Sequence, residues 1–303
     1  MTGGVFSWNL LADIRNLWAF PFMVNAFRAG TIVAVIAGAM GWFMVLRRQS
    51  FAGHTLAVAA FPGAAGATLI GIGAAYGYFA FCIGAAVIIA LATRGRRSAG
   101  SLASESALTG TVQAFTLACG LLFVALYKGF LNGTTALLFG NVLGITARQV
   151  AVLAAVGLAA LAVLAAIGRP LLFASADPDV AAARGVPVRA LAVAFLVLLG
   201  AAVAATAQIT GALLVFALLV MPSATAQRLT PRPLASLVLT VVIGLVVTWA
   251  GLIAAYYSAY PIGFYVTSFA FAAYLAAHLA VASRNRLQRR VRLRHSTRAE
   301  VPA

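Results

Sequence analysis

The sequence predicts an all-α polytopic integral membrane protein, with about eight or nine transmembrane helices and one short helix between two of them. Its composition gives the first reason: 63% of the residues are hydrophobic, 9% are charged, and the mean hydropathy is +1.03. The second is that apolar runs of about 20 residues, long enough to cross a bilayer, recur along the chain. Because lipid offers no hydrogen-bond partners to the backbone, such runs favour helices.

The first segment, residues 1–22, is predicted to be an interfacial amphipathic helix. In "SWNLLADIRNLWAFPF" the apolar residues recur at helical spacing, whereas Asn9, Asp13 and Asn16 lie off that face. No basic region followed by a cleavage site is present, so we expect no signal peptide.

Residues 23–283 are predicted to form the transmembrane domain. The candidate spans are 23–46, 54–72, 74–92, 106–127, 149–168, 188–207, 211–226, 235–256 and 262–283, of which the second, third and seventh have the least defined edges. Small residues at four-residue spacing predict close helix packing in lipid; they are Gly30, Ala34 and Gly38, and Gly63, Ala67 and Gly71.

The connection "FASADPDVAAARGVPVRA", residues 173–190, predicts a short capped helix over 178–184. Asp177 suits the N-cap, Pro178 the first turn and Asp179 the positive end of the helix dipole. Gly185 suits the C-terminal cap, and Pro187 ends the helix. A rigid knob of this kind favours a docking surface, although an ordinary interfacial loop is the simpler alternative.

The positive charge predicts orientation rather than nucleic-acid binding. The net charge is +16, and most of the arginines lie in connections that alternate spans place on one side. The positive-inside rule makes that side cytoplasmic, so we expect an external N-terminus and a cytoplasmic C-terminus. The basic tail, residues 284–303, is expected to lie on anionic lipid headgroups.

The sequence argues against an enzyme and against an ion-coupled carrier. No acidic residue lies near the middle of a span, and neither a metalloprotease HExxH motif nor a P-loop occurs. Any energy for transport must therefore come from a partner. Cys82 and Cys119 lie inside spans without CxxC spacing and are predicted to be small buried side chains.

Four stretches, in order, carry a resemblance to a known family. They are "RRQSFAGHTLAVAAFPG", "ALLFGNVLGIT" (136–146), "DPDVAAARGVPV" (177–188) and "GALLVFALLVMPSATAQRLT" (211–230). The chain resembles the permeases of bacterial zinc, manganese and iron ATP-binding-cassette uptake systems along nearly its full length.

The resemblance implies a homodimeric permease in the bacterial cytoplasmic (inner) membrane, with two cytoplasmic ATPase subunits and an external metal-binding protein as partners. The cargo would be zinc, manganese or iron, with no permanent cofactor. The loop with Asp177, Pro178, Asp179, Ala182 and Gly185 would be the coupling helix that sits in a cleft of the ATPase.

The first stretch departs from the family's "FxGDxLxHxxxPG" pattern, because His54 stands at the aspartate and Val58 at the histidine. The resemblance makes His54, Pro62 and Gly63 transport-pathway residues, with His54 as the one remaining metal ligand. An imidazole suits zinc and other borderline metals. The alternative is that His54 is an interfacial histidine near Arg48.

The function predicted is therefore the permease of an importer for a divalent metal ion. Two alternatives stay open: an importer permease for a metal chelate or another small solute, and a membrane protein that does not transport.

Overall fold

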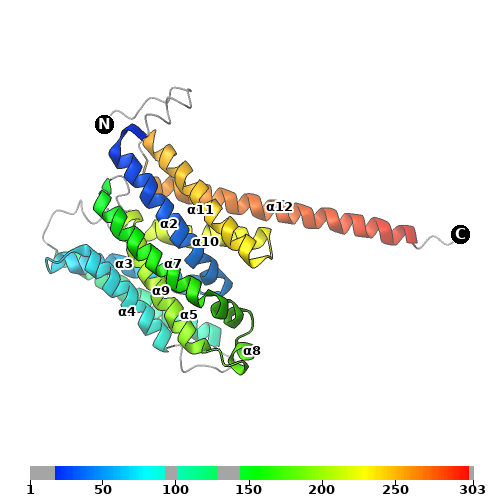
Figure 1. Cartoon of the computed structure of the whole chain (residues 1–303), viewed down its shortest axis with the longest axis horizontal. Coiled ribbons are helices and arrows are strands. Elements are labelled where there is room, and N and C mark those ends of the chain that lie inside the picture. The colour runs from blue at the N-terminus through cyan, green and yellow to red at the C-terminus, as the bar shows by residue number, and fades with distance from the viewer. Residues whose placement is uncertain (1–17, 93–100, 128–143, 259, 300–303) are drawn as a thin grey trace.

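The computed structural model describes residues 18–92, 101–127, 144–258 and 260–299, and every regular element in these ranges is a helix. The helices are α2 (Pro21–Leu46), α3 (Ser50–Leu69), α4 (Ala74–Ala92), α5 (Ser101–Leu126), α7 (Ala147–Ala176), α8 (Pro178–Ala183), α9 (Val188–Thr210), α10 (Ala212–Leu229), α11 (Pro233–Tyr256) and α12 (Ile262–Ala299). They form one bundle, from which the second half of α12 extends (Figure 1).

Each predicted span has a helix in the structure. Within the described residues, 7 helices are long and apolar enough to cross a membrane. The other two, α3 and α10, are less hydrophobic or shorter: α3 is rich in small residues and contains Pro62, and α10 contains Pro222. These are two of the spans whose edges the sequence defined least.

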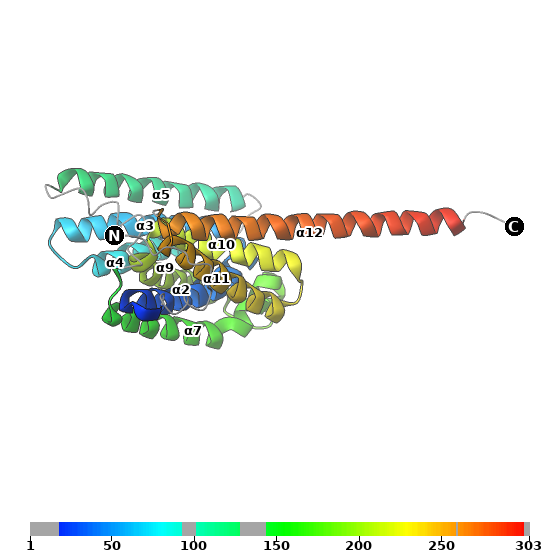
Figure 2. The ribbon, with the colours of Figure 1, turned by 90° about the horizontal axis from the view of Figure 1, so that it is seen from above.

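The centre of the bundle is α2, whose apolar segment is 72% buried, whereas that of α5 or α12 is only 17% buried. Packing around α2 comes from α7, α10 and α11, and α3 lies between α4 and α5 (Figure 2). Hydrogen bonds connect α2 with α11 and α10. The Trp42 indole N–H donates to Ser236 Oγ (3.0 Å), and Gln227 Nε2 donates to the Trp42 carbonyl (2.9 Å).

Glycine determines how closely several helices approach. A Cβ on Gly63 of α3 would overlap the Gly77 carbonyl of α4, and one on Gly77 would overlap the Gly63 carbonyl. In α2, Gly30 and Gly38 face Thr248 and Val241 of α11. The predicted packing at small residues is therefore confirmed at these positions.

Gly71 does not follow this pattern. It lies beyond the end of α3 with φ +77° and would place a Cβ in open space. It serves a turn, which a residue without Cβ adopts at low cost, rather than a helix contact.

The join between α9 and α10 is a single residue. Gly211 has φ 78° and ψ 157°, a region open essentially only to glycine. Thr210 ends one helix and Ala212 begins the next, so no loop separates these two spans.

At its C-terminus the chain stays helical further than the hydropathy predicts. The last span was predicted to end at residue 283, but α12 continues to Ala299 through the basic segment (Figure 2). Arginine, leucine and glutamine are good helix formers in water, so loss of hydropathy there does not end the helix. The predicted boundary of the tail, at 284–303, stays a prediction.

Two predicted features lie largely outside the described residues. The interfacial helix over 1–22 falls mostly in 1–17, and most of the "ALLFGNVLGIT" stretch falls in 128–143. Of the first segment, Trp18, Phe20 and Phe22 are described and are exposed. Exposed aromatic side chains are typical of membrane–water interfaces.

Candidate functional site

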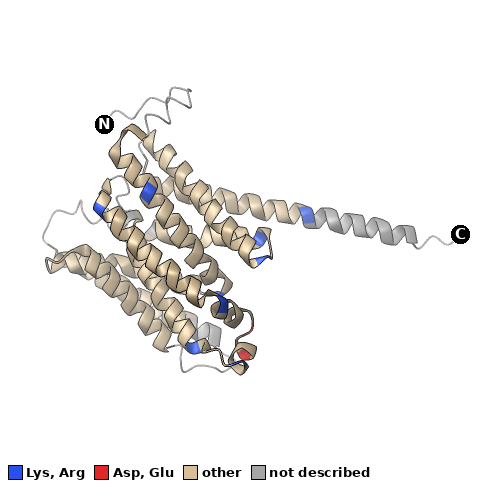
Figure 3. Cartoon of the chain, viewed as in Figure 1, with Lys and Arg blue, Asp and Glu red and all other residues tan. Residues whose placement is uncertain are grey.

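The basic residues gather at one end of the bundle. Figure 3 places most of the described arginines around α8 and near the α10–α11 connection, with a few at the opposite end. Acidic residues are seen only at α8 in the same view. This end therefore differs in charge from the opposite one, and α8 is a short structured element at it.

Helix α8 is capped at both ends. The Asp177 carboxylate accepts hydrogen bonds from the backbone N–H of Asp179 (3.1 Å) and of Val180 (3.0 Å). At the other end Gly185 takes φ +79°, and the Val186 N–H donates to the Ala181 carbonyl (3.0 Å). The predicted caps are therefore present, and they hold a helix of 6 residues that would be marginal without them.

One side of α8 faces the bundle and the other faces outward. Ala181 is fully buried, whereas Ala182 is exposed and Val180 is 47% exposed. Pro178 and Asp179 are exposed as well. The outward side combines small and apolar groups with the Asp179 carboxylate, so a concave partner surface could approach it closely.

His54 lies in the second turn of α3, about 6 Å along the axis from the start of the helix. It is half-buried, and its Nδ1 is buried without a hydrogen-bond partner. Its ring lies 4.6 Å from that of Phe216 in α10. A buried ring nitrogen without a hydrogen-bond partner is unusual in a folded protein.

The described residues contain no group of three or more His, Cys, Asp or Glu side chains that could hold a metal ion. The acids of the chain are Asp13, Glu105, Asp177, Asp179 and Glu300, and none lies in a predicted span, although Glu105 directly precedes the span 106–127. Val58, one turn after His54, adds no donor atom. One chain therefore offers a single imidazole at this position.

The other two predicted pathway residues lie in helix contacts. Gly63 faces Gly77 of α4, and Pro62 is buried with its Cβ toward Gly120 of α5. The structure thus places both where α3 packs, more than two turns beyond His54 along the helix. Their role in a pathway stays a prediction.

A cavity of about 500 Å³ lies between α10 and the start of α12. Its lining includes Phe216, Val220, Met221, Thr267 and Ser268. Phe216 therefore has the cavity and the His54 ring as neighbours. No sequence signal distinguishes this residue, because one phenylalanine in an apolar run has no characteristic pattern.

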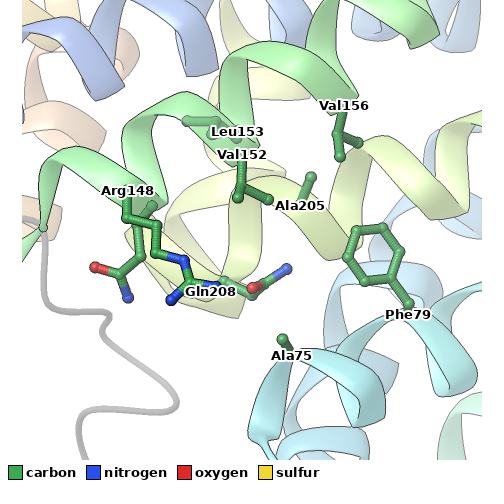
Figure 4. Close-up of a pocket in the computed structure, with 9 residues that line it drawn as sticks. Ala75, Phe79, Arg148, Val152, Leu153, Val156, Ala205 and Gln208 are labelled. Atoms are coloured by element: carbon green, nitrogen blue, oxygen red, sulfur yellow. The ribbon is translucent and has the colours of Figure 1, made fainter.

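A second cavity, of about 240 Å³, lies between α4, α7 and α9 (Figure 4). Arg148 and Gln208 lie near each other on one side of it, and Phe79, Val152 and Val156 form apolar walls. The Arg148 guanidinium repels cations, so this cavity is unsuited to a metal ion.

Comparison with known proteins agrees with this architecture. Residues 19–281 match the model of the ABC 3 transport family. The chain is 30% identical over 244 residues to the manganese transport system membrane protein MntC of Halalkalibacterium halodurans, covering 80% of this chain and 82% of the relative. It is 29% identical over 238 residues to the chelated iron transport system membrane protein YfeC of Yersinia pestis, covering 78% and 79%.

A solved structure, PsaBC from Streptococcus pneumoniae in complex with Fab, matches with a TM-score of 0.77 at 27% identity. The match covers 88% of this chain and 95% of the other. With the family model matching nearly the whole membrane domain, the chain belongs to the ABC 3 transport family and is a multi-pass membrane permease of that family.

Proposed function

We propose that the chain is the permease subunit of an ATP-binding-cassette importer that moves a divalent transition-metal ion into the cytoplasm. The observation that carries this is the family match over residues 19–281, together with relatives named for manganese and chelated iron transport. The permease itself has no nucleotide-binding motif, so a separate ATPase subunit supplies the energy.

The proposed assembly is a homodimer in the bacterial cytoplasmic membrane, surrounded by lipid. Two ATPase subunits dock on α8, where Asp177, Pro178, Asp179, Ala182 and Gly185 build the capped, outward-facing knob. An extracytoplasmic metal-binding protein delivers zinc, manganese or iron at the opposite end. The exposure of one side of α8 supports this arrangement, because Ala181 on the other side is buried within the chain and the Asp177 cap is formed there too.

His54 is the proposed pathway ligand of the metal. Its buried Nδ1 without a partner supports this role, and a second copy of the chain would contribute a second imidazole. Imidazole without carboxylate favours borderline metals such as zinc over the harder manganese. The same acid-poor donor set favours one other cargo, a metal chelate that carries its own ligands.

The first test replaces His54. His54→Ala should leave folding and ATPase assembly intact and lower uptake of radioactive zinc at limiting concentration by about tenfold or more, since losing even an outer-shell partner costs a metal site that much. His54→Gln should also be impaired, because an amide is a poorer ligand for such metals. His54→Asp with Val58→His should transport and shift preference toward manganese.

The control is His278→Ala, which removes an imidazole that lies 2.8 Å from Arg228 on the exposed surface. It should transport as the wild type does. Unchanged uptake of zinc and manganese in both single His54 variants would exclude His54 as a ligand.

The second test concerns orientation, with the basic end in the cytoplasm. In a cysteine-free background, Arg289→Cys should react with an impermeant maleimide only in permeabilised cells. Tyr76→Cys, in the exposed first turn of α4 at the other end, should react in intact cells. The reverse pattern would overturn the orientation.

A further inference from the structure

One arginine at the base of α8 joins helices that are far apart in the sequence. Arg47, the residue after α2, donates from Nη1 to Ser175 Oγ (3.1 Å) and from Nε to Gln49 Oε1 (3.2 Å). Its guanidinium carbon also lies 5.5 Å from the centroid of the Phe195 ring. Three geometrically different contacts therefore fix one half-buried side chain.

The partners of Arg47 lie on both sides of α8. Ser175 is in the last turn of α7, two residues before the Asp177 cap, and its hydroxyl donates to the Leu171 carbonyl. Phe195 is fully buried in α9, which follows α8 along the chain. Because α8 is short and closed by caps, a displacement of α8 must move the end of α7 or the start of α9.

The third partner leads to the pathway helix. Gln49 directly precedes α3, and its carbonyl accepts from the Gly53 N–H (3.0 Å) in the first turn. His54 is the next residue. The Arg47 contacts thus connect the base of α8 with the first turn of α3, which ends directly before the proposed ligand.

We propose that Arg47 is a positioning residue that transmits movement of α8 to α3, and so links ATP-driven motion to the transport pathway. The inference rests on the proposed function, since it takes α8 as the ATPase dock. The planar guanidinium suits this task because it holds both hydrogen bonds and the ring contact in one fixed geometry, which a lysine cannot reproduce. Only a measurement of coupling can establish such a link.

The test uses the purified complex of permease, ATPase and binding protein in proteoliposomes. Arg47→Gln should assemble as the wild type does and hydrolyse ATP at a similar rate. The number of metal ions imported per ATP hydrolysed should fall by about tenfold, a typical size for coupling between two sites. Arg47→Lys should be impaired as well.

The matched control is Arg48→Gln, which removes the same charge from the adjacent, exposed residue and should keep the wild-type ratio. Ser175→Ala should lower the ratio in part, and combining it with Arg47→Gln should add nothing, because both changes break one contact. An unchanged ratio in Arg47→Gln, or transport and hydrolysis that fall in proportion, would overturn the proposal.

Two further outcomes are decided separately. If Arg47→Gln fails to assemble, Ser175→Ala alone gives the answer: an unchanged ratio in that variant overturns the transmission role. If the wild-type permease neither binds an ATPase nor imports metal, the proposed function is wrong and the Arg47 proposal is wrong with it. This outcome is distinguishable, because it is seen in the wild-type protein and not only in the variants.

Discussion

Replacing Ala182 with aspartate is expected to release the ATPase from the permease. Ala182 is on the exposed side of α8, while its neighbour Ala181 is fully buried. In the proposed complex an ATPase cleft closes over this side, so the new carboxylate would be buried without a partner. An unpaired buried charge costs about 3–5 kcal/mol, which corresponds to a loss of affinity of roughly 100-fold or more.

The measurement is co-purification of the two subunits from membranes, followed by metal uptake. The variant permease should reach the membrane in normal amount but elute without the ATPase, and uptake should stop. Ala182→Ser is the matched control, because it keeps a small uncharged side chain and should co-purify normally. Full co-purification of the aspartate variant would remove α8 as the docking element.

Gly77→Ala is expected to destabilise the permease itself. The added Cβ would overlap the Gly63 carbonyl of α3, and a backbone atom cannot rotate away as a side chain can. Helices α3 and α4 would have to separate, and overpacking of this kind typically costs about 1–3 kcal/mol or more. In lipid no hydrophobic force holds the two helices together once the close contact is lost.

The same helix provides the control. A Cβ on Gly84 would meet no atom within 4 Å, so Gly84→Ala should be tolerated and should favour the helix by about 0.5–1 kcal/mol. The midpoint of thermal unfolding in detergent, measured by fluorescence size-exclusion chromatography, is compared between the two variants. Equal unfolding midpoints for Gly77→Ala and Gly84→Ala would contradict the close contact between α3 and α4.

The sequence predicted the helices well because their signal is local. Hydropathy over about 20 residues requires no knowledge of neighbours, and the caps of α8 depend only on residues 177–186. The small-residue spacing likewise predicted that Gly63 packs closely. It could not identify Gly77 as the partner, since a packing partner depends on which helices become neighbours.

The site was less predictable because its contacts join distant parts of the chain. Arg47 and Ser175 are 128 positions apart, and the charge pattern indicated only that both belong to the basic end. The contact of His54 with Phe216 and the cavity beside Phe216 have no sequence signature. The family pattern drew attention to His54, whereas the surroundings of its ring required the fold.

The backbone conformation of Gly211, an achiral residue, determines the direction in which α10 leaves α9. Its φ of 78° and ψ of 157° mirror an extended backbone, so an L-amino acid there is strained by about 1–3 kcal/mol, whereas a D-amino acid would fit. With no intervening loop, a change in the angle between the two helices has to be taken up at or directly beside this residue. The direction in which span α10 leaves span α9 is therefore determined at a single position of the chain.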